Sequence, residues 1–451
     1  MNSSRLTHAM SSSEGMSQIF SPVNTVQRML DVEAALAQAL AAEGVIPQDA
    51  SQDIVEACVA ANIDLDALAR DAGDAGNLAI PLLRQLTAQV AARNAEAARY
   101  VHWGATSQDV IDTGVVLQLR EALQLMRAAL SALADAIAAL AHRYRTAPMM
   151  GRTWMQHALP ITFGLKAAGW LDAVLRHQDR INSLGQRVGV LQFGGASGSL
   201  ASLGDQGLAV AQVLAHQLEL ELPAVPWHGH RDRLTEVATT LGLLTGTLGK
   251  IARDISLQMQ TEVAELSEPV VHGRGGSSTM PHKRNPVGCA AVLAASGRVP
   301  ALVSTMLSAM VQEHERALGG WQAEWDTLPQ ITELAGVALI QLRKVVEGLQ
   351  VDESRMRANI DLTRGLVMAE AVSLALGRHL GRAAAHELVE SACAEALRSN
   401  ATLQEVLQVD SRVTQHLNTH ALEQLFDPSQ YLGEAIAFTD RVLAAHRQRK
   451  V

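Results

Sequence analysis

The residues best suited to chemistry lie in one short polar segment, Gly276 to Pro286. Within it, Ser277 and Ser278 supply hydroxyls, Lys283 an ammonium group and Asn285 an amide. The glycines before it and the two prolines within it prevent an uninterrupted helix. A hydroxyl can exchange a proton, and an ammonium or amide can stabilise negative charge. The segment therefore predicts a polar loop that holds a carboxylate-bearing substrate and moves one proton.

A second polar cluster, His102 to Asp109, precedes a long apolar pattern. Thr106 followed three residues later by Asp109 resembles a capping box, which marks the start of a helix. A helix start with hydroxyls and free N–H groups is an anion site. Taken alone, His102 is also explained as a hydrogen-bonded structural histidine, and both interpretations stay open.

A third polar stretch runs from Gly151 to Pro160 and contains Gln156 and His157. Pro148 just before it ends the preceding helix in a turn, because the residue before a proline is pushed out of the helical region. Pro160 implies a further break, after which we expect a helix over residues 161–184. Structural and functional interpretations of Gln156 and His157 are equally open at this point.

The elements that must position these clusters are long helices. In two stretches the apolar residues recur at alternating spacings of three and four, which is typical of packed long helices. The members are Val116, Leu119, Leu123, Met126, Leu130, Leu133, Ile137 and Leu140, and then Leu234, Val237, Leu241, Leu244, Leu248, Ile251 and Ile255. Further helices are expected over residues 287–310, from after Trp321 to about residue 349, and within residues 360–451. The fold class predicted is all-α.

Composition narrows the function classes. The chain has 451 residues, of which 48% are hydrophobic and 3% aromatic, and its net charge is −9. Without a basic surface, nucleic-acid binding is not expected. No uninterrupted apolar run approaches ~20 residues, so no membrane span is expected. The first 15 residues are polar and lack the apolar core of a signal peptide, and three widely separated cysteines favour reduced thiols in the cytoplasm.

Neither a metal site nor a nucleotide site is indicated. His228 and His230 are two residues apart, so they diverge on a helix and do not make a zinc pair. The glycine-rich run from Gly194 to Ser199 lacks the lysine of a phosphate-binding loop, and close backbone packing or a substrate-lining turn explains it better. We therefore expect no metal and no cofactor.

In these three clusters taken together, the chain resembles the fumarase/aspartase superfamily. The segment Gly276 to Pro286 resembles its signature loop, and residues 102–109 and 151–164 resemble its two other active-site regions. The resemblance covers nearly the whole chain. It implies an all-helical subunit of three domains, residues 1–110, 111–355 and 356–451. It also implies a homotetramer whose active sites each take their three regions from three different subunits.

The resemblance also implies shared chemistry and residue roles. The reaction is an addition to, or elimination from, a small dicarboxylate or tricarboxylate, through removal or delivery of a proton next to a carboxylate. Ser277 is implied as the catalytic acid or base, with Lys283, His102 and His157 as further proton-transfer candidates. Another segment, His314 to Trp325, resembles one branch of the superfamily and contains Arg316. The residues expected to bind substrate are Thr106, Ser107, Gln156, Asn285, Arg316 and Trp154.

The chain departs from the superfamily at two positions. Many members have a histidine after the Gly-Arg-Thr run and a glutamate five residues after the signature asparagine, where this chain has Trp154 and Ala290. In those enzymes the pair serves the departing group or a water molecule. Hydroxide is a poor leaving group, with water's pKa near ~15.7, whereas a carboxylate is a good one, with a pKa near ~4. The double loss favours a cycloisomerase, in which a carboxylate of the substrate itself adds to a double bond.

Two alternatives remain open from the residues. An adenylosuccinate lyase-like enzyme would share the signature wording, but its amine leaving group needs a general acid, and the missing histidine counts against it. A catalytically silent helical scaffold is the alternative from another class. The presence of Ser277, Lys283 and Asn285 together counts against that second alternative.

Overall fold

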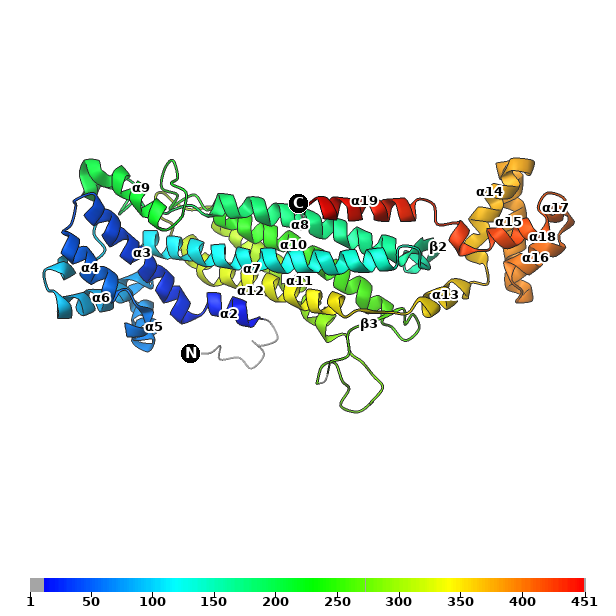
Figure 1. The fold of residues 1–451 in the computed structure, drawn as a ribbon, viewed down its shortest axis with the longest axis horizontal. Coiled ribbons are helices and arrows are strands. Elements are labelled where there is room, and N and C mark those ends of the chain that lie inside the picture. Colours follow the sequence, from blue (N-terminus) through cyan, green and yellow to red (C-terminus); the bar gives the residue numbers. More distant parts are fainter. Residues whose placement is uncertain (1–11, 272, 450–451) are drawn as a thin grey trace. The chain divides into compact units, whose positions relative to one another are not determined.

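The computed structural model describes residues 12–271 and 273–449, and helices dominate the described chain (Figure 1). The N-terminal helices are α2 (Glu14–Ile19), α3 (Pro22–Ala42), α4 (Gln48–Ala57), α5 (Leu65–Ala75) and α6 (Ala79–Arg93). The long helices are α7 (Ser107–Arg143), α8 (Phe163–Val188), α10 (Asp232–Gln258), α11 (Val287–Ala309) and α12 (Gly320–Glu347), with the shorter α9 (Gly207–Gln217). The all-α prediction is confirmed.

The C-terminal helices are α13 (Glu353–Asp361), α14 (Ala369–Leu380), α15 (Arg382–Ser399), α16 (Leu403–Val409), α17 (Ser411–Thr414), α18 (Thr419–Leu425) and α19 (Ala435–Gln448). Short 3-10 turns join several of the helices, namely Ala60–Asn62, Ala97–Tyr100, Ala201–Gln206, Leu366–Met368 and Pro428–Gln430. A separate core within α14–α18 is built from Val372, Leu376, Leu388, Leu403 and Leu407, all buried.

The alternating apolar spacings do produce long helices. Helix α7 runs for 37 residues, and the predicted apolar residues from Val116 to Ile137 are buried along it, with Leu140 half-buried. Helix α10 has 27 residues and contains the second set of predicted apolar residues, from Leu234 to Ile255. Its glycines allow close packing: a Cβ at Gly242 would lie 3.2 Å from Val303 of α11. Small residues therefore bring these two helices together.

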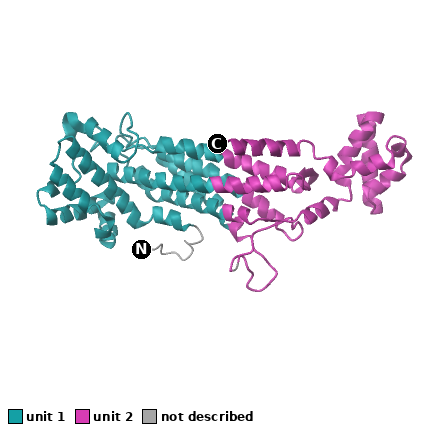
Figure 2. Cartoon of the chain, in the orientation of Figure 1, with its two compact units in different colours: residues 1–130, 177–249, 291–341 teal, residues 131–176, 250–290, 342–451 magenta. Residues whose placement is uncertain are grey.

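The described chain divides into two compact units (Figure 2). Unit 1 comprises residues 1–130, 177–249 and 291–341, and unit 2 comprises residues 131–176, 250–290 and 342–451. The long helices α7, α8, α10, α11 and α12 each contribute residues to both units. The division into three domains expected from the superfamily stays a prediction.

Two short antiparallel strand pairs interrupt the helices and were not predicted. Strand β1 (Pro148–Thr153) pairs with β2 (Gln156–Thr162), and β3 (Leu266–Ser267) pairs with β4 (Gln350–Val351). The first pair forms a hairpin where the sequence suggested a turn and a broken helix. Helix α8 begins only at Phe163, after the second strand.

Two helices, α7 and α11, are long and apolar enough to cross a membrane by length and composition alone. Polar residues interrupt the apolar sequence of both helices, so neither contains an uninterrupted apolar run of ~20 residues. The most apolar part of α7 is 44% buried and that of α11 is 28% buried. Core helices of soluble proteins pass the same test, so the absence of a membrane span stays a prediction.

Candidate active site

The start of α7 is organised by the buried carboxylate of Asp109, in unit 1. Its oxygens accept hydrogen bonds from the backbone N–H groups of Thr106, Gly194 and Gly195, at 2.9–3.0 Å. The ring Nε2 of His228 lies 2.7 Å from the same carboxylate. The predicted capping box is thus half formed, because Asp109 caps the backbone of Thr106 and leaves the threonine hydroxyl for other partners. The glycine-rich run proves to be a close-packed turn.

That hydroxyl is bound by Arg316, so two predicted substrate-binding residues lie together in unit 1. Nη2 of Arg316 donates to Oγ1 of Thr106 over 3.1 Å and to the carbonyl of Ala196 over 3.2 Å. Its Nε donates to the Gln108 side-chain oxygen over 3.2 Å. Thr106 and Ser107 are half-buried, whereas Arg316 is exposed. The guanidinium of Arg316 therefore lies beside the start of α7, and a positive charge next to a helix N-terminus suits a carboxylate.

A buried ion cluster lies beneath this turn. Arg231 is 1% exposed and donates paired hydrogen bonds to both Asp112 and Glu324, at 2.6–3.1 Å. The indole of Trp321 and the amide of Gln108 also donate to Asp112. The two carboxylates keep Arg231 charged and raise its pKa even though burial alone would lower it. The cluster ties α7 and α12 to Arg231, the residue just before α10.

His102 belongs to the same unit and is held from α3. Its Nδ1 lies 2.6 Å from Oε1 of Glu33, a residue that is 1% exposed. Burial lowers the pKa of His102, but the charge and hydrogen bond of Glu33, with a contribution from Asp109, outweigh that effect and raise it overall. The ring is therefore more readily protonated than an ordinary histidine.

The second predicted region forms the tip of the β1–β2 hairpin in unit 2. Thr153 pairs with Gln156, which leaves Trp154 and Met155 as a two-residue turn. Both have left-handed backbone angles, with φ of 50° and 63°. Such turns normally carry Asn or Gly. The side chains of Trp154 and Met155 are 93% and 77% exposed. Two large apolar groups thus project away from their own unit on a strained turn, and Gln156 beside them is exposed.

The base of this hairpin is anchored by a buried carboxylate. Arg152 donates two hydrogen bonds to Glu265, at 2.6 and 2.9 Å, and the Asn359 amide donates to the same glutamate over 2.8 Å. His157 pairs with Arg152 across the two strands. Burial and the nearby Arg152 lower the pKa of His157, so it favours the neutral form. Its Nδ1 is buried and has no hydrogen-bond partner within the part of the chain that the structure describes.

The signature segment is a loop in unit 2 whose two ends are joined by backbone contacts. Gly276 and Arg284 form an isolated antiparallel bridge, and the Asn285 backbone N–H donates to the carbonyl of Gly275 over 2.8 Å. A Cβ on Gly275 would lie 2.7 Å from the Asn285 carbonyl oxygen, so glycine is needed there. Within the loop, Oγ of Ser277 accepts a hydrogen bond from the backbone N–H of Met280 over 3.0 Å. Ser277 is half-buried.

The remaining loop residues face solvent to different degrees. Lys283 is exposed and Asn285 is half-buried, with its amide 3.4 Å from the Gly276 carbonyl. Helix α11 begins directly after the loop. Its first N–H groups, at Gly288 and Cys289, donate hydrogen bonds to Glu268, which precedes the loop in sequence. This helix start is therefore occupied by the chain's own carboxylate. Ala290 follows it on the exposed side of the first turn.

The structure thus gathers the predicted residues into two sets. Thr106, Ser107, His102 and Arg316 belong to unit 1, and Trp154, Gln156, His157, Ser277, Lys283 and Asn285 belong to unit 2. Sequence reasoning found the capping role of Asp109 but missed the roles of Glu33, Gln108, His228 and Glu265. Glu33 and Glu265 are buried acids next to apolar residues in sequence, and such a pattern is a signal that can be read from sequence. His228 was considered only as a metal ligand. Among the described residues no group of three His, Cys, Asp or Glu side chains could hold a metal.

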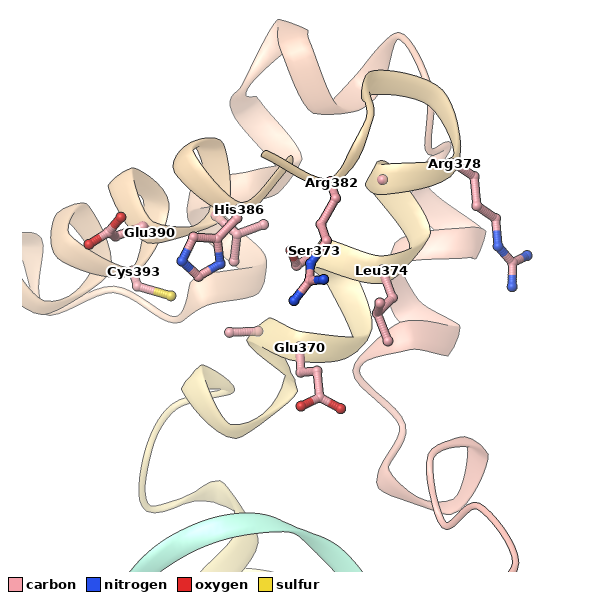
Figure 3. Close-up of a pocket in the computed structure, with 11 residues that line it drawn as sticks. Glu370, Ser373, Leu374, Arg378, Arg382, His386, Glu390 and Cys393 are labelled. Carbon is pink, nitrogen blue, oxygen red and sulfur yellow. The ribbon is translucent and has the colours of Figure 1, made fainter. Parts of the chain in front are cut away.

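A pocket of about 1080 Å³ lies between α14 and α15 in unit 2 (Figure 3). Its walls carry Arg382, His386 and Glu390 from α15 and Glu370 and Ser373 from α14. Arg382 reaches into the space beside Ser373, while Arg378 points outward. None of the predicted site residues lines it, so its size does not mark the site predicted from the sequence.

Comparison with known proteins places the chain in a family. Residues 9–301 match the family described as lyase, and residues 365–442 match the adenylosuccinate lyase C-terminus. A 3-carboxy-cis,cis-muconate cycloisomerase of Pseudomonas aeruginosa is 54% identical over 96% of this chain and 94% of its own length. The crystal structure of 3-carboxy-cis,cis-muconate lactonizing enzyme from Pseudomonas putida has a TM-score of 0.95 and 50% identity, and the match covers 99% of this chain and 100% of that one.

A fumarate lyase structure from Mesorhizobium sp. BNC1 is also similar, with a TM-score of 0.88 and 42% identity over 96% of this chain and 98% of that one. The likeness therefore spans the whole described fold and includes all three polar segments. The chain belongs to the lyase family, the fumarase/aspartase superfamily that its signature segment predicts.

Proposed function

We propose that this protein is a cycloisomerase that converts 3-carboxy-cis,cis-muconate to 4-carboxymuconolactone. One carboxylate oxygen of the substrate forms a bond to a carbon of the diene, and a proton is delivered to the neighbouring carbon. The observation that carries the proposal is the full-length similarity to cycloisomerases, at 54% identity and a TM-score of 0.95. A lyase that closes a ring in this way needs a carboxylate-binding site and one proton-transfer group.

The turn at the start of α7 supports the first requirement. Arg316 and the hydroxyl of Thr106 form a charged, hydrogen-bonding surface, and Gln108 orients the guanidinium. We assign substrate carboxylate binding to Thr106, Ser107 and Arg316, with Gln156 of the hairpin as a further donor. A charge-assisted hydrogen bond of this kind contributes roughly 1.5–3 kcal/mol.

The signature loop supports the second requirement. The backbone N–H groups of Thr279 and Met280 both point at the oxygen of Ser277, at 3.3 and 3.0 Å. Donors directed at an oxygen stabilise the negative charge that it carries after losing a proton. Ser277 can therefore give its proton to the substrate carbon. We assign Lys283 and Asn285 to the aci-carboxylate that forms next to the reacting carbon, and keep His157 as a neutral relay candidate.

The two departures from the superfamily fit ring closure. The attacking group is a carboxylate that is already ionised and already part of the substrate, so proximity replaces activation by a base. Trp154 at the hairpin tip provides an apolar surface where other members carry a histidine. Ala290 on α11 removes the acidic partner. Neither residue can assist a poor leaving group, and the proposed reaction has none.

We further propose a homotetramer whose active sites are shared between subunits. Helix α11 is apolar, yet only 28% of its most apolar stretch is buried, and Trp154 is almost fully exposed. Surfaces of this kind are covered by partner helices or partner sites in oligomers. Light scattering of purified protein would give a mass near four times 48.2 kDa. A monomeric mass at working concentration would contradict the proposal.

No metal or cofactor enters the proposed reaction, and the cytoplasm is the proposed location, in keeping with free cysteines at positions 58, 289 and 393. Activity should survive dialysis against a chelator, measured as the initial rate before and after treatment. A lost rate that returns when a divalent metal is added would show that the proposal omits a metal.

The ultraviolet absorbance of the diene tests the function directly. Purified protein should remove the diene band of 3-carboxymuconate, since ring closure breaks the conjugation, and should leave adenylosuccinate unchanged. A match of residues 365–442 to the adenylosuccinate lyase C-terminus makes that lyase the second candidate. Cleavage of adenylosuccinate alone would favour it. No change with either substrate would favour the silent scaffold.

A further inference from the structure

Helix α3 carries an acidic residue where an apolar one would be expected. Its buried face consists of residues such as Leu30, Leu36 and Leu40, and Glu33 is buried among them with 1% exposure. An ionised carboxylate is costly to bury unless it is paired. The packing of α3 alone gives no reason for the charge. Its partner, the imidazole of His102, therefore explains why the carboxylate is there.

The backbone at His102 holds the ring in a defined place. His102 has a φ of 60°, in the left-handed region that few residues other than glycine occupy. Gly104 follows with a φ of 82°, and a Cβ there would lie 2.7 Å from Leu203. The turn is thus fixed against its surroundings. Thr106, four residues after His102, forms the proposed carboxylate-binding surface together with Arg316.

The charges around His102 favour its protonated form. Glu33 faces it from α3, and Asp109 from α7 adds a second negative charge. Cys58 is also close enough to feel the charge of Glu33. Burial, and then the charges of Glu33 and Asp31, raise the pKa of its thiol, so Cys58 keeps its proton and adds no charge near His102. The His102 side chain keeps 19% exposure, and within the described residues its hydrogen bond is made through Nδ1. The other nitrogen, Nε2, is thereby left for solvent or a ligand.

We infer that Glu33 is a positioning residue, which orients the ring of His102 and holds it as the imidazolium, so that Nε2–H acts as a charged donor to a substrate carboxylate. This inference rests on the proposed function for the identity of the ligand. It decides between two possible roles of His102, because a ring protonated on both nitrogens can donate and cannot accept a proton. His102 is then a carboxylate anchor, and it is not the base of the site.

The pKa of His102 can be measured without any assay of activity. Deuterium exchange at the imidazole C2–H, followed by mass spectrometry of the peptide containing His102, reports the pKa of that one histidine in the intact protein. In the unaltered protein we expect a value above the ordinary ~6.5. Glu33→Gln keeps an oxygen that can accept from Nδ1–H but removes the charge, so the pKa of His102 should fall measurably.

Asp31→Asn is the matched control, because it removes a carboxylate from the same helix without touching His102. It should leave the pKa of His102 where it was. A pKa at or below ~6.5 in the unaltered protein overturns the inference, even if Glu33→Gln does not fold. An unchanged pKa in Glu33→Gln overturns it as well.

The activity profile gives an independent readout. Because the proposed active form is protonated, kcat/KM should fall as the pH rises through the His102 pKa. In Glu33→Gln that fall should move to lower pH, and KM should rise about tenfold near neutral pH with a smaller change in kcat. Equal losses at every pH, with the His102 pKa unchanged, would show a purely structural role. If neither substrate reacts while the pKa results hold, the cycloisomerase proposal fails and the role of Glu33 stands.

Discussion

The guanidinium of Arg316 and the hydroxyl of Thr106 meet at 3.1 Å although 210 residues separate them in sequence. The contact joins the segment between α11 and α12 to the first turn of α7. It gives the helix start a positive charge that the backbone N–H groups alone do not supply.

Replacing Arg316 with methionine should therefore weaken substrate binding. We expect kcat/KM to fall about 10²-fold through loss of a charged hydrogen bond, mostly as a rise in KM. Steady-state kinetics with 3-carboxymuconate would measure this. Arg412→Met, which breaks a surface pair with Asp410, is the matched control and should change neither constant. A wild-type KM in Arg316→Met would remove Arg316 from the site.

Ser277→Ala should lower kcat by ~10²–10⁴, because the proton-transfer group is lost while the carboxylate-binding residues remain. KM should change little. Ser278→Ala, which removes the neighbouring hydroxyl in the same loop, serves as the control and should retain most of the activity. An unchanged kcat in Ser277→Ala would rule out the role assigned to this hydroxyl.

Restoring the superfamily's His–Glu pair tests the argument from the leaving group. The double variant Trp154→His with Ala290→Glu should not speed lactone formation, since the attacking carboxylate needs no activation. We expect kcat/KM for 3-carboxymuconate to fall, because the apolar surface of Trp154 is lost. The measurement is the initial rate of loss of diene absorbance. A large gain in rate would contradict the argument.

Hybrid oligomers test whether subunits share active sites. Arg316→Met removes a group in unit 1, and Ser277→Ala removes one in unit 2. If the two groups that serve one site come from different subunits, co-expression of the inactive variants should restore about a quarter of the wild-type activity, by random assembly. The two variants can carry different affinity tags so that only hybrids are assayed. Complete inactivity of the purified hybrids would show that each site uses one chain for both groups.

The buried ion cluster predicts a large effect on stability. Arg231→Met leaves Asp112 and Glu324 buried without their shared cation, and breaking such a pair costs ~3–5 kcal/mol. Arg187→Met, which breaks a pair with Glu236 that is about half exposed, should cost about 1 kcal/mol or less. Urea unfolding at one fixed protein concentration would compare them. Similar midpoints for the two variants would show that the cluster contributes little.

The parts of the fold that sequence could predict are those with a repeated local signal. The apolar spacing from Val116 to Ile137 specified α7, in which these residues are buried. The β1–β2 hairpin gave no such signal. Its turn residues are Trp154 and Met155, which lack the positional preferences that identify a tight turn.

Only the parts of the candidate site that lie within a contiguous motif could be predicted from the sequence. The signature loop, the α7 start and the polar stretch from Gly151 to Pro160 were each identified from contiguous residues. The partners that fix them come from elsewhere in the chain: Glu33 lies 69 residues before His102, and Glu265 lies 113 residues after Arg152. Contacts over such separations depend on how helices pack. No pattern in a single sequence specifies them.

The tip of the β1–β2 hairpin has a consequence for how such an enzyme can change. Trp154 and Met155 make little contact with their own unit, and the hairpin is secured instead at its base by Arg152 and Glu265. A substitution at the tip therefore alters what the tip touches without disturbing the fold that carries it. Under the proposed function, substitutions here change the surface offered to the substrate at small cost in stability, so new activities can be sampled one residue at a time.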